Sequence, residues 1–167
     1  MDRVETTILR NLVHDEEYLR KVIPFIEPDY FSDHTDRVIF QEIAEFIVKY
    51  DKPATQEILN IELEDRTDVT EEEYKSAKEF IAALGPVPTN NEWLMDTTEK
   101  WCRDRAIYLA LMKSIKIADG QDEKKGRDAI PSILSDALSV SFDNHIGHDY
   151  LNDYEERYEA YHRKEDR

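Results

Sequence analysis

The stretch from Trp93 to Phe142 constrains the fold most, because its apolar residues repeat at helical spacing in two successive segments. The first segment has an apolar residue at every seventh position, the spacing of a helix that presents one seam to a partner. This seam consists of Leu94, Trp101, Tyr108 and Ile115, and it is broadened by Leu111, Met112 and Ile117. After a polar break containing Gly120 and Gly126, the second segment follows with i, i+3, i+4 spacing; its apolar stripe is Ile130, Ile133, Leu134, Ala137, Leu138 and Phe142. Short connections favour antiparallel neighbours, so we expect an antiparallel helical hairpin.

The apolar surface of this hairpin exceeds what one small domain needs. Periodicity alone supports two interpretations equally: the hairpin is simply core, or it is core that also mediates self-association.

The remaining apolar pattern is helical as well. Stripes at helical spacing occupy residues 4–13, 18–23, 38–48, 58–63 and 74–84, and the breakers Pro24, Pro28, Pro53 and Gly85–Pro86 fall between them. No array of alternating strands and no internal repeat is present. We therefore predict an all-α protein with a globular helical head over residues 1–88, a helical hairpin for oligomerisation over 89–142, and a linker with a docking helix over 143–167.

Composition narrows the function. The 167 residues carry a formal net charge of −16 at pH 7, a field that repels phosphate, so binding of nucleic acid through the general surface is not expected. A single cysteine, Cys102, rules out an internal disulfide framework. With no long apolar span, we expect a soluble, cytoplasmic protein without a membrane partner.

The last segment has a tyrosine-rich stripe that a short helix cannot bury by itself. Its members are Tyr150, Leu151, Tyr154, Tyr158 and Tyr161. This stripe either packs back on the same chain or, as the preceding linker allows, docks on a neighbouring subunit. The sequence stops at Arg167 without a glycine cap, and we expect it to be a fragment of a longer protein.

Catalytic motifs are missing. None of the four glycines forms a phosphate-binding loop, and His145 and His148 with Asp149 lack the further ligands of a zinc site. Cys102 has no signature of a nucleophile. We therefore predict no catalytic, cofactor-binding or metal-ligating residue here. One hypothesis from these features is a stand-alone acidic helical adaptor or inhibitor, of the helicase-loader or DNA-mimic type.

Several motifs resemble the N-terminal region of DnaB-type replicative helicases, in particular those of T-even phages. The first is Phe-Ile-Glu-Pro-Asp-Tyr-Phe at 25–31, followed by Val-Ile-Phe-Gln-Glu-Ile at 38–43. Residues 99–106, Glu-Lys-Trp-Cys-Arg-Asp-Arg-Ala, resemble the start of that family's hairpin. The most specific match runs over 129–143 and continues through Gly-His-Asp-Tyr at 147–150.

The resemblance implies a collar that precedes a RecA-like ATPase domain absent from this chain, and that motor domain would hold ATP and Mg²⁺. In the family, the collar supports a hexameric ring that translocates 5′ to 3′ on single-stranded DNA. The implied partners are a second copy of the chain, the motor domain of the adjacent subunit, primase, a helicase loader and, through the absent domain, single-stranded DNA. Carried over to this sequence, the collar interface would be Leu94, Trp101, Tyr108, Ile115, Ile130, Ile133, Leu134 and Leu138. The docking face on the neighbouring subunit would be Tyr150, Leu151, Tyr154, Tyr158 and Tyr161.

Overall fold

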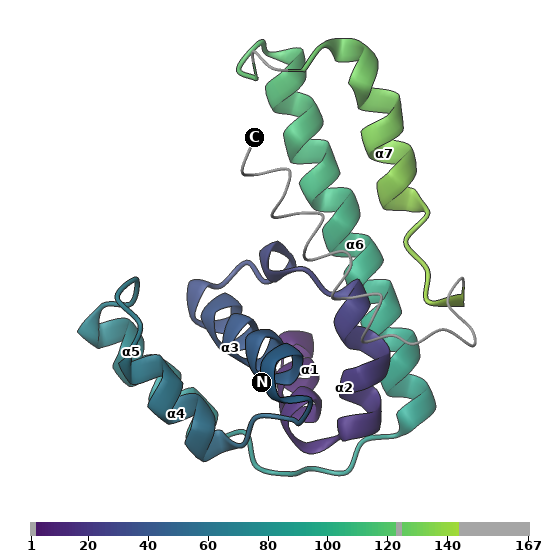
Figure 1. Cartoon of the computed structure of the whole chain (residues 1–167). Coiled ribbons are helices and arrows are strands. Elements are labelled where there is room, and N and C mark those ends of the chain that lie inside the picture. The colour runs from purple at the N-terminus through teal and green to yellow at the C-terminus, as the bar shows by residue number, and fades with distance from the viewer. Residues whose placement is uncertain (1–2, 123–124, 144–167) are drawn as a thin grey trace.

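A computed structural model describes residues 3–122 and 125–143, which form a helical head with a helical hairpin projecting from it (Figure 1). The helices are α1 (Val4–His14), α2 (Glu16–Val22), α3 (His34–Tyr50), α4 (Gln56–Glu64), α5 (Glu71–Ala82), α6 (Asn91–Ala118) and α7 (Ile130–Leu138). Short 3₁₀ turns lie at Ile23–Phe25, Pro28–Tyr30 and Arg127–Ala129. No strand occurs in this part of the chain, and the predicted all-α class with an antiparallel hairpin is confirmed.

Polar side chains at the starts of α2 to α6 explain why these five helices begin where they do. Each accepts a hydrogen bond from a backbone N–H in the first turn, a group that has no partner within the helix. These caps are Asp15, Asp33, Thr55, Thr70 and Asn90. The pattern Thr70 to Glu73 predicts a capping box, and both of its reciprocal bonds are present.

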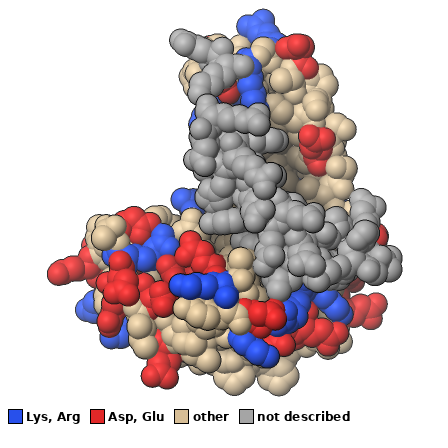
Figure 2. Space-filling model, in the orientation of Figure 1, with Lys and Arg blue, Asp and Glu red and all other residues tan. Residues whose placement is uncertain are grey.

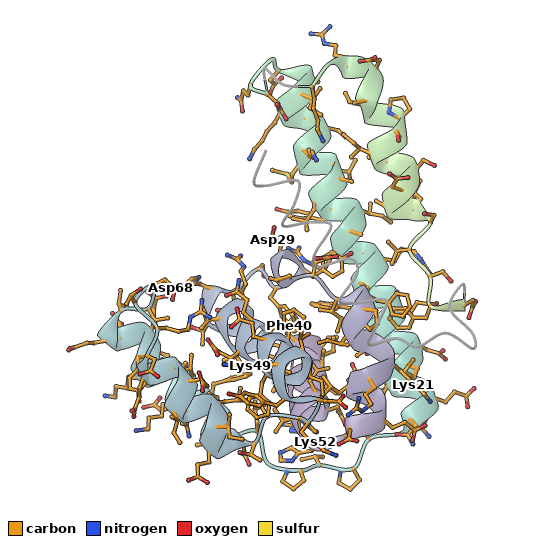
Figure 3. All side chains as sticks on the ribbon, in the orientation of Figure 1. Lys21, Asp29, Phe40, Lys49, Lys52 and Asp68 are labelled. Atoms are coloured by element: carbon orange, nitrogen blue, oxygen red, sulfur yellow. The ribbon has the colours of Figure 1, made fainter. Side chains whose placement is uncertain are left out.

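Large apolar side chains from α1, α2 and α3 fill the head. Phe40 lies in the middle of it (Figure 3), with its ring centroid 5.2 Å from that of Phe31. Both side chains are fully buried, as are Leu9, Leu12, Leu19, Ile39, Ile43 and Ile47. A continuous, close-packed core of this kind is a main source of the stability of the head.

Arg66 fastens α4 and α5 to the rest of the head. Its guanidinium contacts Glu42 Oε1 on α3 at 2.9 Å and Asp68 Oδ2 at 2.6 Å, and it also donates to Gln41 Oε1 at 2.9 Å. Burial raises the pKa of Glu42, and the hydrogen bond from Arg66 opposes that rise.

The first half of α6 completes the head core. Leu94, Thr98 and Cys102 are buried there, and the Tyr18 hydroxyl lies 2.6 Å from Thr98 Oγ1. The division after residue 88 stays a prediction; the core of the head continues into α6 as far as Cys102.

Phe142 does not continue the second hairpin helix. That helix ends at Leu138, and the chain then turns back to the head, where the Phe142 ring packs 4.5 Å from that of Phe25. The Phe142 N–H donates to Glu99 Oε2 at 2.8 Å. The prediction of one helical stripe through Phe142 is wrong, because the sequence spacing does not distinguish a residue within the helix from one beyond its end that packs against the head.

None of the helices in the described ranges combines the length and the apolar character that crossing a bilayer would require.

Candidate self-association surface

The hairpin is built around a seam of small side chains. Ala110 and Ser114 on α6 face Ala137 on α7, and Ile117 is the one large residue that is buried on this side of α6. Small residues let two helix backbones approach closely, but they bury little apolar area.

Polar contacts fasten the hairpin at both ends. At the tip, the Arg127 guanidinium donates to the carbonyl oxygen of Ala118 at 3.1 Å. Near the head, Arg103 Nε donates to the carbonyl oxygen of Val140 at 2.9 Å. These bonds and the return of Phe142 to the head hold α7 against α6.

A row of exposed apolar side chains runs along the other side of α6. Tyr108, Leu111, Met112 and Ile115 follow i, i+3, i+4, i+7 spacing and are between 41% and 53% exposed. At 100° per residue this row, which we call the α6 apolar row, lies on the side of the helix away from the Ala110–Ser114–Ile117 seam. The helix is therefore apolar on two faces, of which α7 covers one.

The predicted interface residues fall into three groups. Leu94 and Trp101 are 2% and 9% exposed and belong to the head core, where the Trp101 ring centroid lies 4.8 Å from that of Phe31. Tyr108 and Ile115 lie on the exposed apolar row. On α7, Ile130, Ile133 and Leu134 are half-buried, whereas Leu138 is 63% exposed.

The heptad seam is thus one stripe in the sequence, but its two halves lie in different environments in the structure. Its first half packs inside the head and its second half faces solvent. Leu111 and Met112, placed at the edge of the seam by the sequence, belong to the centre of the exposed row. Their exposed fractions separate them from the buried residues of the seam, and sequence spacing alone does not predict which residues of a helix are exposed.

The predicted docking stripe, Tyr150, Leu151, Tyr154, Tyr158 and Tyr161, lies outside the described residues and stays a prediction.

Charge is unevenly distributed around this surface. In the view of Figure 2, acidic and basic side chains crowd the head, and the flank of the hairpin formed by α7 is mostly uncharged. At the hairpin tip, the neighbouring ammonium of Lys125 lowers the pKa of Lys113, and partial burial adds to the effect. A row of exposed apolar side chains such as the one on α6 suits contact with another protein surface rather than with solvent.

In the described ranges, no group of three or more His, Cys, Asp or Glu side chains could hold a metal ion. Cys102 is buried in the head core. The described residues of α6 thus present an exposed apolar row on a helix whose first half is buried in the head.

Comparison with known proteins gives one informative relationship. No protein-family profile matches the chain. The chain is 35% identical over 162 residues to a DnaB-like replicative helicase of Enterobacteria phage T4, a match that covers 92% of this chain. The chain spans only 34% of the length of that helicase. The resemblance predicted from the sequence is therefore confirmed: along nearly its whole length, this chain is similar to part of a DnaB-like replicative helicase.

Proposed function

We propose that this chain is the collar of a hexameric, ATP-dependent replicative DNA helicase that moves 5′ to 3′ on single-stranded DNA in the cytoplasm of its host cell. In this role the chain performs no catalysis. ATP and Mg²⁺ belong to a RecA-like motor domain, which also grips the DNA. The collar supports ring assembly and provides the surface on which primase docks, and a helicase loader is a further partner.

The observation that carries this proposal is the α6 apolar row. Exposure of this apolar surface to water is unfavourable. Pairing with the same row of a second copy would remove the surface from water; the row consists of Tyr108, Leu111, Met112 and Ile115. The similarity to a DnaB-like replicative helicase supports the same reading, because a ring requires contacts between copies.

The test is the self-association of the 167-residue chain, measured by sedimentation velocity at micromolar concentrations. We expect concentration-dependent dimers. Ile115→Glu should weaken the dimer roughly tenfold to a hundredfold, because it removes about 1.5–3 kcal/mol of apolar burial and adds a charge. The matched control is Ile61→Glu on α4, because Ile61 and Ile115 are both 53% exposed; this variant should behave like the wild type.

A second candidate is the stand-alone acidic adaptor or inhibitor. The net charge of −16 favours it, since such a chain can occupy a basic nucleic-acid-binding partner by charge mimicry. The same experiment separates the two functions. A chain that stays monomeric at all concentrations, with Ile115→Glu indistinguishable from Ile61→Glu, would contradict the collar and favour the adaptor.

A further inference from the structure

An open groove lies between the α1–α2 junction and the segment that leads into α6. Both of these segments lie at the base of the head, at the end opposite the hairpin tip (Figure 1). One wall is the junction of α1 with α2, and the other is the segment 86–89 that leads into α6. The groove encloses about 490 Å³, a volume typical of sites that hold a small ligand or a few residues of a peptide. It shares no residue with the α6 apolar row.

Hydrogen bonds hold the two walls at a fixed separation. His14 Nε2 lies 2.6 Å from the carbonyl oxygen of Leu84, and Asn11 Nδ2 donates to Thr89 Oγ1 at 3.4 Å. Asn11 Nδ2 also donates to the carbonyl oxygen of Thr7 at 2.9 Å, which fixes its side chain on α1. The groove therefore exists before any ligand binds, so a ligand does not pay the entropy of ordering it.

Arg10, in the groove, has no bonding partner among the described residues. Its Nε atom is buried without a hydrogen bond, and no described carboxylate forms an ion pair with its guanidinium. Every other arginine of the described ranges has a carboxylate or carbonyl partner: Arg3, Arg20, Arg37, Arg66, Arg103, Arg105 and Arg127. Because no described side chain pairs with this guanidinium, its positive charge is available to an anion that enters the groove.

The acids of the groove do not supply this anion. Asp15 Oδ1 accepts the Tyr18 N–H at 3.0 Å, and Glu16 Oε2 lies 3.5 Å from Arg20 Nε. Their charges are engaged at the start of α2, but they still disfavour a doubly charged phosphate more than a singly charged carboxylate. The net charge of −16 likewise disfavours a nucleic-acid backbone.

The opposite wall adds an apolar element. Val87 is 53% exposed and lies between Pro86 and Pro88, so this wall offers an uncharged surface next to Arg10. A carboxylate flanked by apolar side chains matches both features.

We propose that this groove binds a short peptide segment of a partner protein, which places an acidic side chain against the Arg10 guanidinium and an apolar side chain against Val87. The site is separate from the self-association surface and does not depend on the collar function. Arginine recognises a carboxylate through two parallel N–H···O bonds, which gives the pairing its specificity.

The test is a titration of the full-length, ¹⁵N-labelled chain followed by NMR, with the peptide acetyl-Leu-Glu-Leu-amide as probe. Backbone amides of residues 10–16 and 86–89 should shift. Replacing the peptide's Glu by Gln should weaken binding roughly tenfold or more, since a charge-assisted hydrogen bond contributes about 1.5–3 kcal/mol. Arg10→Gln should cause the same loss, and Arg10→Lys should recover part of it.

Two further variants control the experiment. Lys52→Gln removes an exposed positive charge at the base of the head (Figure 3) outside the groove and should leave binding unchanged. Val87→Asp places a repelling charge at an exposed position that the fold does not need, so it tests the groove even if Arg10→Gln fails to fold. Running the titration in Ile115→Glu separates this proposal from the self-association of the collar.

Three results would overturn the proposal. The first is the absence of groove shifts up to about 10 mM peptide, a concentration that corresponds to very weak binding. The second is equal binding of the Glu and Gln peptides. The third is an equal or larger response of the same amides to inorganic phosphate or to a single-stranded oligonucleotide, which would make the groove a general anion or nucleic-acid site.

Discussion

The helices of the head and those of the hairpin pack together through different kinds of side chain. In the head, large aliphatic and aromatic residues such as Phe31, Phe40 and Trp101 interlock and are shielded from solvent. In the hairpin, the seam between α6 and α7 uses Ala110, Ser114 and Ala137, and most of the large apolar residues in the second half of α6 are exposed. The hairpin therefore buries less large apolar side chain along its own seam than the head does in its core.

This difference indicates which interactions stabilise each region. The head is stabilised by a core of fully buried large apolar side chains. The hairpin instead depends on α6, a 28-residue helix about 42 Å long whose first half is rooted in the head core. A rigid helix that is anchored at one end and apolar on its free face is suited to presenting a surface to another chain.

The largest effect is expected in the head. Phe40→Ala removes a fully buried ring and should lower the free energy of unfolding by about 3–5 kcal/mol, because it leaves a cavity in a close-packed core. Urea denaturation followed by circular dichroism measures it. A loss below about 1 kcal/mol would contradict the contrast between head and hairpin, since it would mean that the head core is not tightly packed.

A smaller effect is expected in the hairpin seam. Ala110→Leu forces extra volume between α6 and α7 and should cost about 1–3 kcal/mol. The same change at the exposed Ala118 is the control and should stay within about 0.5 kcal/mol of the wild type. Hydrogen exchange of the α7 amides should report the loss first. Equal tolerance at both positions would show that the seam does not require small residues.

The smallest effect concerns the polar link between α3 and the α4–α5 arm. Burial raises the pKa of Glu42 above its ordinary value, so the folded state holds this proton up to a higher pH than the unfolded state does. The stability that comes from this proton is fully present below the unfolded pKa and is lost as pH rises through the folded pKa. The free energy of unfolding of the wild type, relative to Glu42→Gln, should therefore increase as pH falls from about 7 to about 4. A flat or decreasing difference in urea titrations would contradict the assignment.

Much of the fold follows from local sequence rules. Apolar spacing located the helices, and the capping pattern at Thr70 and Glu73 located the start of α5. These signals are readable because they depend on neighbours within one turn.

The sequence could not reveal which partner covers each apolar residue. Leu94 and Ile115 occupy equivalent heptad positions, but the first is buried by the head and the second is exposed. Burial depends on contacts between segments that are distant in the chain. For the same reason, the sequence could not show that Arg10 lacks a described partner. Phe142 shows the same limit, because its burial comes from Phe25 in the head rather than from a helical neighbour.

The central claim is that a second copy covers the α6 apolar row. Isotope-filtered NOE spectroscopy on an equal mixture of ¹³C-labelled and unlabelled chains tests it most directly, because it records only contacts between copies. We predict cross-peaks from the methyl groups of Leu111, Met112 and Ile115 to the unlabelled copy, and none from Ile61 on the head. Dimers whose intermolecular cross-peaks arise from the head and not from the α6 row would contradict the account.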